Sequence, residues 1–135
     1  MKVSNYVFCA GAALALVACT GKITDINDQR VYFAYDSAQI DGSAKSGLLA
    51  QSEYLKEKKD VKIQIAGNCD ERGTQEYNLA LGAKRANAAK QVLVKDGIEA
   101  KRIKTISYGK DRPIAKGTGE SAWSQNRNAT TTAVK

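Results

Sequence analysis

Four stretches of this chain carry the short hydrophobic runs that are typical of β-strands. Residues 31–35 are β-branched and aromatic throughout, which favours a strand. Residues 61–65 alternate between apolar and polar positions, so we expect a strand with one buried face. Residues 103–108 predict a third strand. Residues 130–134 are rich in threonine, and we expect there a final strand that lies at an edge or is half exposed.

Two longer segments follow a helical period instead. Residues 44–58 place apolar side chains on a rough helical repeat, after a potential N-cap in residues 41–43. A second helix is expected to begin after Thr74, which can cap it, and to end at Gly97. Its apolar stripe has small residues at the centre, which would let it lie close to a sheet. Residues 121–126 favour a further short helix.

The order of these elements, β-α-β-α-β-β, defines the expected fold class. It predicts an α+β sandwich in which helices pack on a small mixed sheet. The chain has 135 residues, which is enough for one domain of this kind.

The N-terminal segment has the pattern of an export signal. Residues 6–18 are apolar but shorter than the about 20 residues that a spanning helix needs. They end in Leu16-Val17-Ala18-Cys19, which resembles the lipobox of bacterial lipoproteins. Cys19 would carry the acyl chains and become the new N-terminus. A plain secretory signal and a short buried helix are the alternatives.

This interpretation divides the chain into three parts. We expect a lipoprotein signal peptide in residues 1–18, a lipidated N-terminus and polar tether in residues 19–30, and one domain in residues 31–135. Thr20 stands where aspartate retains enterobacterial lipoproteins in the inner membrane. By that rule the acyl chains on Cys19 would sit in the outer membrane, with the domain facing the periplasm.

Composition removes several classes of function. The chain has no histidine, so the commonest general base and zinc ligand are missing, and we expect no metal and no cofactor. Its three cysteines lack metal-ligand spacing and cannot build a disulfide framework. The net charge of +7 favours anionic partners.

The most informative motif is a polar loop, residues 67–74, that runs into the second helix. With three other pieces, it resembles the peptidoglycan-associated lipoproteins, the lipid-anchored branch of the OmpA-like domain family. The four pieces that carry the resemblance, in family order, are residues 31–40, 67–88, 106–113 and 122–127. Together they are far more specific than any one of them alone.

The resemblance implies a non-catalytic domain that binds the meso-diaminopimelate of the peptidoglycan stem. The aspartate and arginine that carry this binding in the family fall on Asp70 and Arg85. Such a pair suits the ligand, because a carboxylate accepts from its ammonium and a guanidinium grips its carboxylate with two hydrogen bonds. The start of the helix at Thr74 adds free amides that favour the same carboxylate. A structural ion pair between Asp70 and Arg85 is the alternative.

Other residues are assigned supporting roles. Asn78 and Leu79 would help to orient the stem, and Asn68 stands as a donor where the family usually has histidine. We expect Cys69 to be a small buried residue, and Glu71 and Arg72 to be surface or loop-bracing charges. Asn126 and Arg127 match a family pair that we expect to brace the site. The sequence departs from the family pattern at Ala34, where aspartate is frequent, and at Asn128, where the family has arginine.

Four readings of function follow, and the first is favoured. The chain would tether the outer membrane to peptidoglycan, with TolB and other Tol proteins as further partners and a part in cell division and envelope integrity. A glycan hydrolase using Asp70 and Glu71 is disfavoured, because adjacent carboxyls do not span a glycosidic bond. A nucleic-acid module is disfavoured by export and by the lack of an RNP-like aromatic motif. The fourth is a purely structural lipoprotein that bridges envelope proteins.

Overall fold

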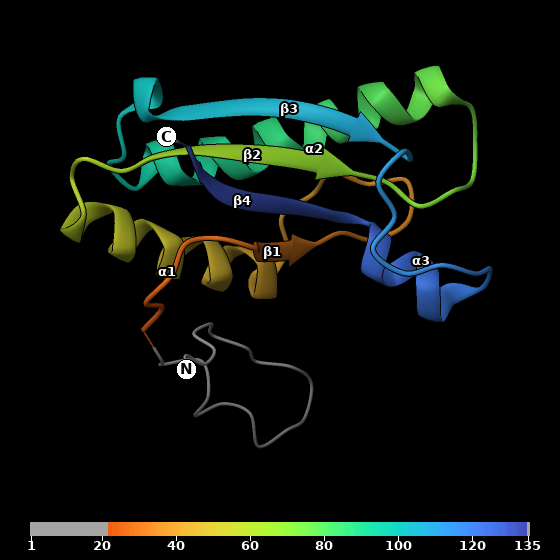
Figure 1. Ribbon diagram of the computed structural model, residues 1–135, viewed down its shortest axis with the longest axis horizontal. Coiled ribbons are helices and arrows are strands. Elements are labelled where there is room, and N and C mark those ends of the chain that lie inside the picture. Colours follow the sequence, from red (N-terminus) through yellow and green to blue (C-terminus); the bar gives the residue numbers. More distant parts are fainter. Residues whose placement is uncertain (1–21, 135) are drawn as a thin grey trace.

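A computed structural model of the chain describes residues 22–134, and these form a two-layer α+β domain (Figure 1). Its elements are β1 (Gln29–Tyr32), α1 (Gly42–Glu57), β2 (Lys62–Asn68), α2 (Gln75–Lys95), the 3-10 turn η2 (Ala100–Arg102), β3 (Ile103–Gly109), α3 (Glu120–Asn126) and β4 (Asn128–Val134). The strands form one sheet in the order β1-β4-β2-β3. Only β2 and β3 are parallel, so the sheet is mixed. The predicted fold class is confirmed.

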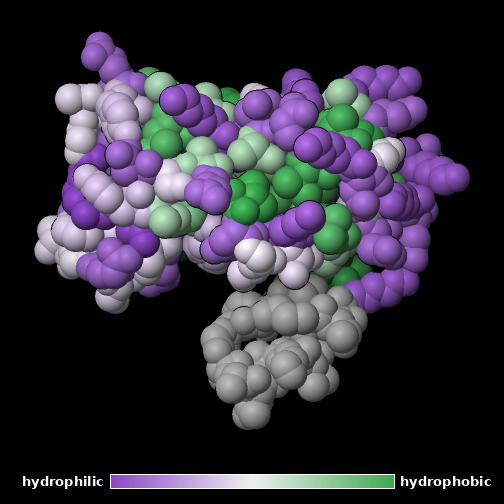
Figure 2. All heavy atoms as spheres, turned by 180° about the vertical axis from the view of Figure 1, so that it is seen from behind, coloured by the Kyte–Doolittle hydropathy of each residue, from purple (hydrophilic) through white to green (hydrophobic). Residues whose placement is uncertain are grey.

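The core lies between the sheet and the two long helices. Ile63 and Ile65 of β2 point toward Leu48 and Leu55 of α1 and Leu93 of α2, and all five side chains are fully buried. The period-2 pattern of β2 and the helical repeat of α1 therefore meet in one apolar layer. Seen from the helical side, apolar atoms also gather at the surface over the helices, among predominantly polar neighbours (Figure 2).

The caps expected from the sequence are present. Asp41 accepts a hydrogen bond from the Ala44 amide and begins α1. Thr74 accepts one from the Tyr77 amide at 3.1 Å and begins α2. Gly97 follows the last residues of α2 with a φ of 107°, in the left-handed region that glycine adopts without strain. These contacts fix where both helices start and where α2 ends.

Two glycines set how closely α2 lies on the sheet. A Cβ atom at Gly67 of β2 would fall 1.7 Å from the carbonyl oxygen of Gly82 in α2. One at Gly82 would fall 2.3 Å from Oγ of Ser107. The small residues expected in the stripe of α2 thus allow a direct backbone-to-backbone approach. This approach places the middle of α2 beside the end of β2.

The position of the threonine-rich strand differs from one of the two expectations. β4 is not an edge strand, because it pairs with β1 on one side and β2 on the other. Its threonines find side-chain partners: Thr131 donates from its buried hydroxyl to Oε1 of Gln51 at 2.7 Å. Thr132 and its outward-facing neighbours keep the strand half exposed, as the other expectation held. Satisfied hydroxyls make a polar central strand stable.

The segment assigned to the tether also takes part in the fold. Ile23 and Ile26 are 4% and 1% exposed and belong to the main apolar cluster. Gln29 and Arg30 already pair with β4. The expected domain boundary at residue 31 was therefore too late, because two isolated isoleucines dock a polar-looking segment on the core. The signal segment and Cys19 lie outside the described residues.

No helix within residues 22–134 is long and apolar enough to cross a membrane.

Candidate functional site

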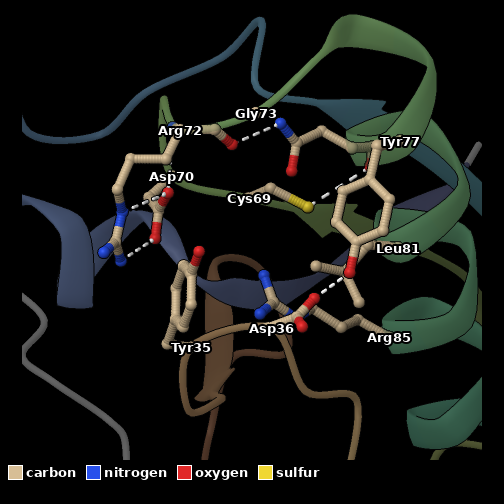
Figure 3. Close-up of a pocket in the computed structure, with 10 residues that line it drawn as sticks. Tyr35, Asp36, Cys69, Asp70, Arg72, Gly73, Tyr77, Leu81 and Arg85 are labelled. Atoms are coloured by element: carbon tan, nitrogen blue, oxygen red, sulfur yellow. Dashed lines mark hydrogen bonds and ion pairs between the residues drawn. The ribbon is translucent and has the colours of Figure 1, made fainter.

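A small pocket with charged and aromatic residues in its lining opens where β2 ends and α2 begins (Figure 3). Its volume is about 60 Å³. The residues that line it are Tyr35, Asp36, Cys69, Asp70, Arg72, Gly73, Tyr77, Asn78, Leu81 and Arg85. They come from three segments: the chain after β1, the loop between β2 and α2, and the first turns of α2. The two residues expected to carry binding, Asp70 and Arg85, thus line the same pocket.

Arg85 is held in place by backbone carbonyls. The side chain is 1% exposed and donates to the carbonyl oxygens of Ser37, Asn68 and Ala34 at 2.8, 2.9 and 3.1 Å. A guanidinium carries more N–H groups than these three carbonyls accept, so it retains donors for a further acceptor. Burial lowers the pKa of Arg85 from its usual value, but a guanidinium stays protonated at neutral pH. The pocket therefore contains a fixed positive charge.

Asp70 is 5% exposed and is surrounded by cations. Arg72 donates to both of its carboxylate oxygens, from Nε at 3.2 Å and from Nη2 at 2.8 Å, and its amide adds a bond of 3.0 Å. Nη1 of Arg127 lies 3.6 Å from the same carboxylate. Burial opposes ionisation, but the hydrogen bonds and charge of Arg72, aided by Arg127, outweigh it and hold the pKa of Asp70 below its usual value.

The structure contains no direct ion pair between Asp70 and Arg85 within residues 22–134. The alternative from the sequence, a structural ion pair between Asp70 and Arg85, is therefore wrong. Arg85 is satisfied by carbonyls, while Asp70 is satisfied by Arg72 and Arg127. The two opposite charges line the same small pocket, and each is held there by different neighbouring groups. Such a space can receive a group that carries both a cation and an anion.

Arg72 forms the outer wall of the pocket. Its guanidinium lies 4.0 Å from the ring centre of Tyr35 and 3.8 Å from that of Trp123 in α3. The indole N–H of Trp123 donates in turn to Glu71 at 2.8 Å. The expectation that Glu71 and Arg72 brace the loop holds for both residues. Arg72 in addition covers Asp70 directly.

Asp36 and Tyr77 close the opposite side. The Tyr77 hydroxyl donates to the Asp36 carboxylate, and Figure 3 draws this hydrogen bond as a dashed line between the two side chains. Asp36 adopts a φ of 54°, a left-handed conformation that turns the chain sharply after β1. No cationic partner of Asp36 is found among the ion pairs of the described residues. It is a second carboxylate in the pocket, and sequence reasoning did not find it.

The other expected site residues divide into two groups. Asn78 lines the pocket, is 2% exposed, and donates to the carbonyls of Arg72 and Thr74. Thr74 caps α2 but does not line the pocket. Leu79 is 39% exposed and points elsewhere, while Leu81 lines the pocket in its place. The Asn68 side chain lies outside the pocket, although its carbonyl anchors Arg85.

The two positions that depart from the family pattern near the last strand contact each other. Nδ2 of Asn68 donates to Oδ1 of Asn128 at 2.9 Å across the β2–β4 pair. Asn128 is fully buried and also accepts from Thr130. One hydrogen bond joins the two amides, while Oδ1 of Asn68 is buried without a partner among the described residues. The β2–β4 register continues through this pair, so the last strand remains docked despite these departures.

The pair before β4 braces the site. The side-chain oxygen of Asn126 accepts from the amides of Ile114 and Ala115, which holds the loop before α3. Arg127 donates to the carbonyl of Phe33 at 2.8 Å and pairs with Glu120. These contacts join the segment after β1, α3 and the pocket into one unit.

Cys69 is the small buried residue that the sequence predicted. It is 4% exposed, and its thiol donates to the carbonyl of Asn78 at 3.3 Å. Burial raises the pKa of the thiol above its usual value, so it is not a reactive thiolate. Within residues 22–134 no group of three or more His, Cys, Asp or Glu side chains is placed to hold a metal ion.

Comparisons with known proteins place this chain in a family. The OmpA family model matches residues 32–127. The chain is 46% identical over 122 residues to a peptidoglycan-associated lipoprotein of Mesorhizobium japonicum, covering 90% of this chain and 73% of that protein. It is 47% identical over 102 residues to one of Agrobacterium fabrum, covering 76% of this chain and 58% of that protein.

Solved structures agree. The crystal structure of the peptidoglycan-associated lipoprotein from Burkholderia pseudomallei has a TM-score of 0.76 and 40% sequence identity, covering 78% of this chain and 90% of that one. The C-terminal domain of Helicobacter pylori MotB has a TM-score of 0.71 at 21% identity, covering 82% and 85%, and so shares the fold. The chain belongs to the OmpA family. Its resemblance to the peptidoglycan-associated lipoproteins is confirmed.

Proposed function

We propose that the pocket binds the zwitterionic end of the meso-diaminopimelate side chain in the peptidoglycan peptide stem. The observation that carries this proposal is the placement of Asp70 and Arg85 on one small pocket without pairing to each other. Diaminopimelate presents an ammonium and a carboxylate on one carbon. The remaining N–H groups of Arg85 suit the carboxylate, and Asp70 suits the ammonium.

The size of the pocket supports an end group as ligand. A cavity that holds a benzene ring measures about 150 Å³. The pocket is about 60 Å³, so it suits the end of a side chain rather than a sugar ring. Its position before the first turn of α2 adds the positive end of the helix dipole, which favours a carboxylate. The relatives named above carry peptidoglycan association in their name.

We further propose that the protein is an envelope lipoprotein. Acyl chains on Cys19 would hold it in the outer membrane, and the pocket would hold the cell wall on the periplasmic side. Binding two supports at once needs only modest affinity at each, because the anchor raises the local concentration of wall sites. This mechanism involves no catalytic step. TolB and other Tol proteins would be its partners in cell division and envelope integrity.

The pocket assignment is tested with tripeptides and the full-length lipoprotein in detergent. L-Ala-D-Glu-meso-diaminopimelate is expected to bind at least tenfold more tightly than L-Ala-D-Glu-L-Lys, which lacks the second carboxylate. Arg85→Lys keeps a positive charge but loses the planar fork, and it should remove this preference. Arg102→Lys is the matched control, since Arg102 also binds three backbone carbonyls but lies far from the pocket. Equal binding of both tripeptides by the wild-type protein would contradict the assignment.

The lipid anchor needs a separate test. Cells producing the protein are labelled with radioactive palmitate and then fractionated. We expect label on the wild-type protein in the outer-membrane fraction, and none on Cys19→Ser. Cys69→Ser serves as the control, because this buried thiol is not an acylation site. Label that persists in Cys19→Ser would overturn the anchor.

A further inference from the structure

The carboxylate expected to receive the ligand's ammonium already has cationic partners at both of its oxygens. Both oxygens of Asp70 accept hydrogen bonds from Arg72, and Arg127 lies 3.6 Å from one of them. Because Asp70 is 5% exposed, a ligand ammonium must compete with these guanidinium groups for the same two oxygens. A close ion pair with the ligand is therefore favoured when one of the two groups moves away.

The two guanidinium groups differ in how firmly they are held. The Arg127 side chain is 7% exposed, donates to the Phe33 carbonyl and forms two hydrogen bonds with Glu120. The Arg72 side chain is 31% exposed, and its guanidinium bonds only to Asp70 among the described residues. Its other contacts are the faces of Tyr35 and Trp123. Arg72 is therefore the group that can leave at the lower cost.

We propose that Arg72 is a specificity-determining residue that acts as an internal counter-ion and competes with the ligand's ammonium for Asp70. This inference rests on the proposed function, because it concerns the same pocket. Arg72 mimics the ligand in the empty pocket: a flat cation that satisfies Asp70 with two hydrogen bonds. Binding exchanges one ion pair for another, so only part of the new interaction appears as affinity.

The arrangement has a physical rationale. Without Arg72, the buried carboxylate of Asp70 would accept no side-chain hydrogen bond and would keep only Arg127, at 3.6 Å, as a cationic neighbour, which is costly. The aromatic faces of Tyr35 and Trp123 orient the guanidinium without fixing it by hydrogen bonds. The pocket is thereby kept stable when empty, and its affinity for any ammonium ligand is lowered by the same competition. A ligand that lacks the ammonium does not meet this competition.

Arg72→Gln tests the proposal, because glutamine removes the charge and keeps a polar side chain. Binding to the full-length lipoprotein in detergent is measured by calorimetry with two probes. One is L-Ala-D-Glu-meso-diaminopimelate, and the other is the same tripeptide with its side-chain ammonium acetylated. Competition predicts at least threefold tighter binding of the first probe by the variant and unchanged binding of the second. If the substitution instead damaged the pocket, the variant would bind both probes more weakly than the wild-type protein.

Arg112→Gln is the matched control. Arg112 also stacks on an aromatic ring, at 3.7 Å from the centre of Tyr108, but it forms no ion pair within the described residues. It should leave the binding of both probes unchanged. Arg72→Lys, which keeps the charge and loses the fork, should lie between the wild-type protein and Arg72→Gln.

The outcomes separate this inference from the proposed function. If the wild-type protein binds the diaminopimelate probe and Arg72→Gln binds it equally or more weakly, Arg72 positions Asp70 instead of competing for it, and the inference is wrong. If neither protein binds either probe, the proposed function fails and the inference fails with it. Tighter binding of the ammonium probe alone supports both.

Discussion

Two arginines at opposite ends of the sheet make the same kind of contact but lie in different surroundings. Arg85 donates to three backbone carbonyls beside the end of β2. Arg102 donates to the carbonyls of Val61, Leu55 and Lys58 beside the start of β2 and the end of α1. Both join segments distant in sequence, and both would be described as structural from these bonds alone.

The difference lies in what the remaining donors face. Arg85 is fully buried and lines a pocket that also contains Asp36 and Asp70. Arg102 is half-buried and does not line that pocket. Both guanidinium groups brace the fold, but only Arg85 has further donors in a space that it shares with carboxylates to which it is not bonded. This difference is the reason for proposing Arg85, and not Arg102, as a binding group.

The largest difference between the two arginines should appear in stability. Arg85→Ala leaves three buried carbonyls without donors and opens a cavity, so we expect a loss of about 4 kcal/mol in the free energy of unfolding. Arg102→Ala should cost about 1.5 kcal/mol, because water can reach the freed carbonyls. Urea denaturation measures both. Equal losses would show that burial does not distinguish them.

A second comparison, between the carboxylates at the two ends of α2, concerns ligand binding. Asp70 precedes α2 in the pocket, and Asp96 follows it, where it pairs with Ser52 and Lys56. Asp70→Asn should weaken diaminopimelate tripeptide binding at least tenfold, about 1.4 kcal/mol, by removing the charge that pairs with the ammonium. Asp96→Asn should leave it unchanged. Weakening by both variants would point to a general loss of structure.

Helix caps should have a smaller effect. Thr74→Ala removes the cap of α2 beside the pocket and should cost about 1 kcal/mol of stability. Asp41→Ala removes the cap of α1 and should cost a similar amount. Because Thr74 does not line the pocket, tripeptide binding should change less than twofold in both. Thermal unfolding measures the stability and calorimetry measures tripeptide binding. A tenfold loss of binding in Thr74→Ala alone would show that Thr74 belongs to the binding site.

The smallest effect concerns acid. Despite burial, Arg72 holds the pKa of Asp70 below its usual value, and hydrogen bonds from Ser52 and Lys56 do the same for Asp96. A carboxyl whose pKa is lower in the folded state contributes stability above its unfolded pKa, about 3.9, and loses it as the pH falls through the folded value. We therefore expect the free energy of unfolding to decrease when the pH is lowered below about 4. The free energy of unfolding of Asp70→Asn should fall less steeply with decreasing pH than that of the wild-type protein. The same slope in both proteins would contradict a contribution from Asp70.

Much of the fold could be predicted because each element has a local cause. The alternation in β2, the caps at Asp41 and Thr74 and the glycine after α2 are all visible along the chain. The central place of β4 was not, because the buried hydroxyl of Thr131 is satisfied by Gln51 on α1, far away in the sequence. The packing of Ile23 was missed for a similar reason, since a single buried side chain in a polar segment has no period.

The site was predicted in part. Asp70 and Arg85 stand in a recognisable loop and helix, and the structure brings them to one pocket. Asp36 reaches that pocket through a left-handed turn after β1, which no pattern in the sequence indicated. Arg72 could be placed on the loop, but its contact with Asp70 depends on two aromatic faces from distant segments. The positions of Asp36 and Arg72 in the pocket thus depend on contacts between loops, which the hydrophobic periodicity of the sequence does not reveal.

The burial of Ile23 limits how far the domain can stand from a bilayer. Between Cys19 and Ile23 the backbone spans at most about 14 Å, even when drawn out completely. If Cys19 holds the acyl chains, the linker between the membrane and the folded domain is shorter than α2, whose 21 residues extend over about 30 Å. The width of the gap between membrane and wall would then be set by the body of the domain rather than by a flexible spacer.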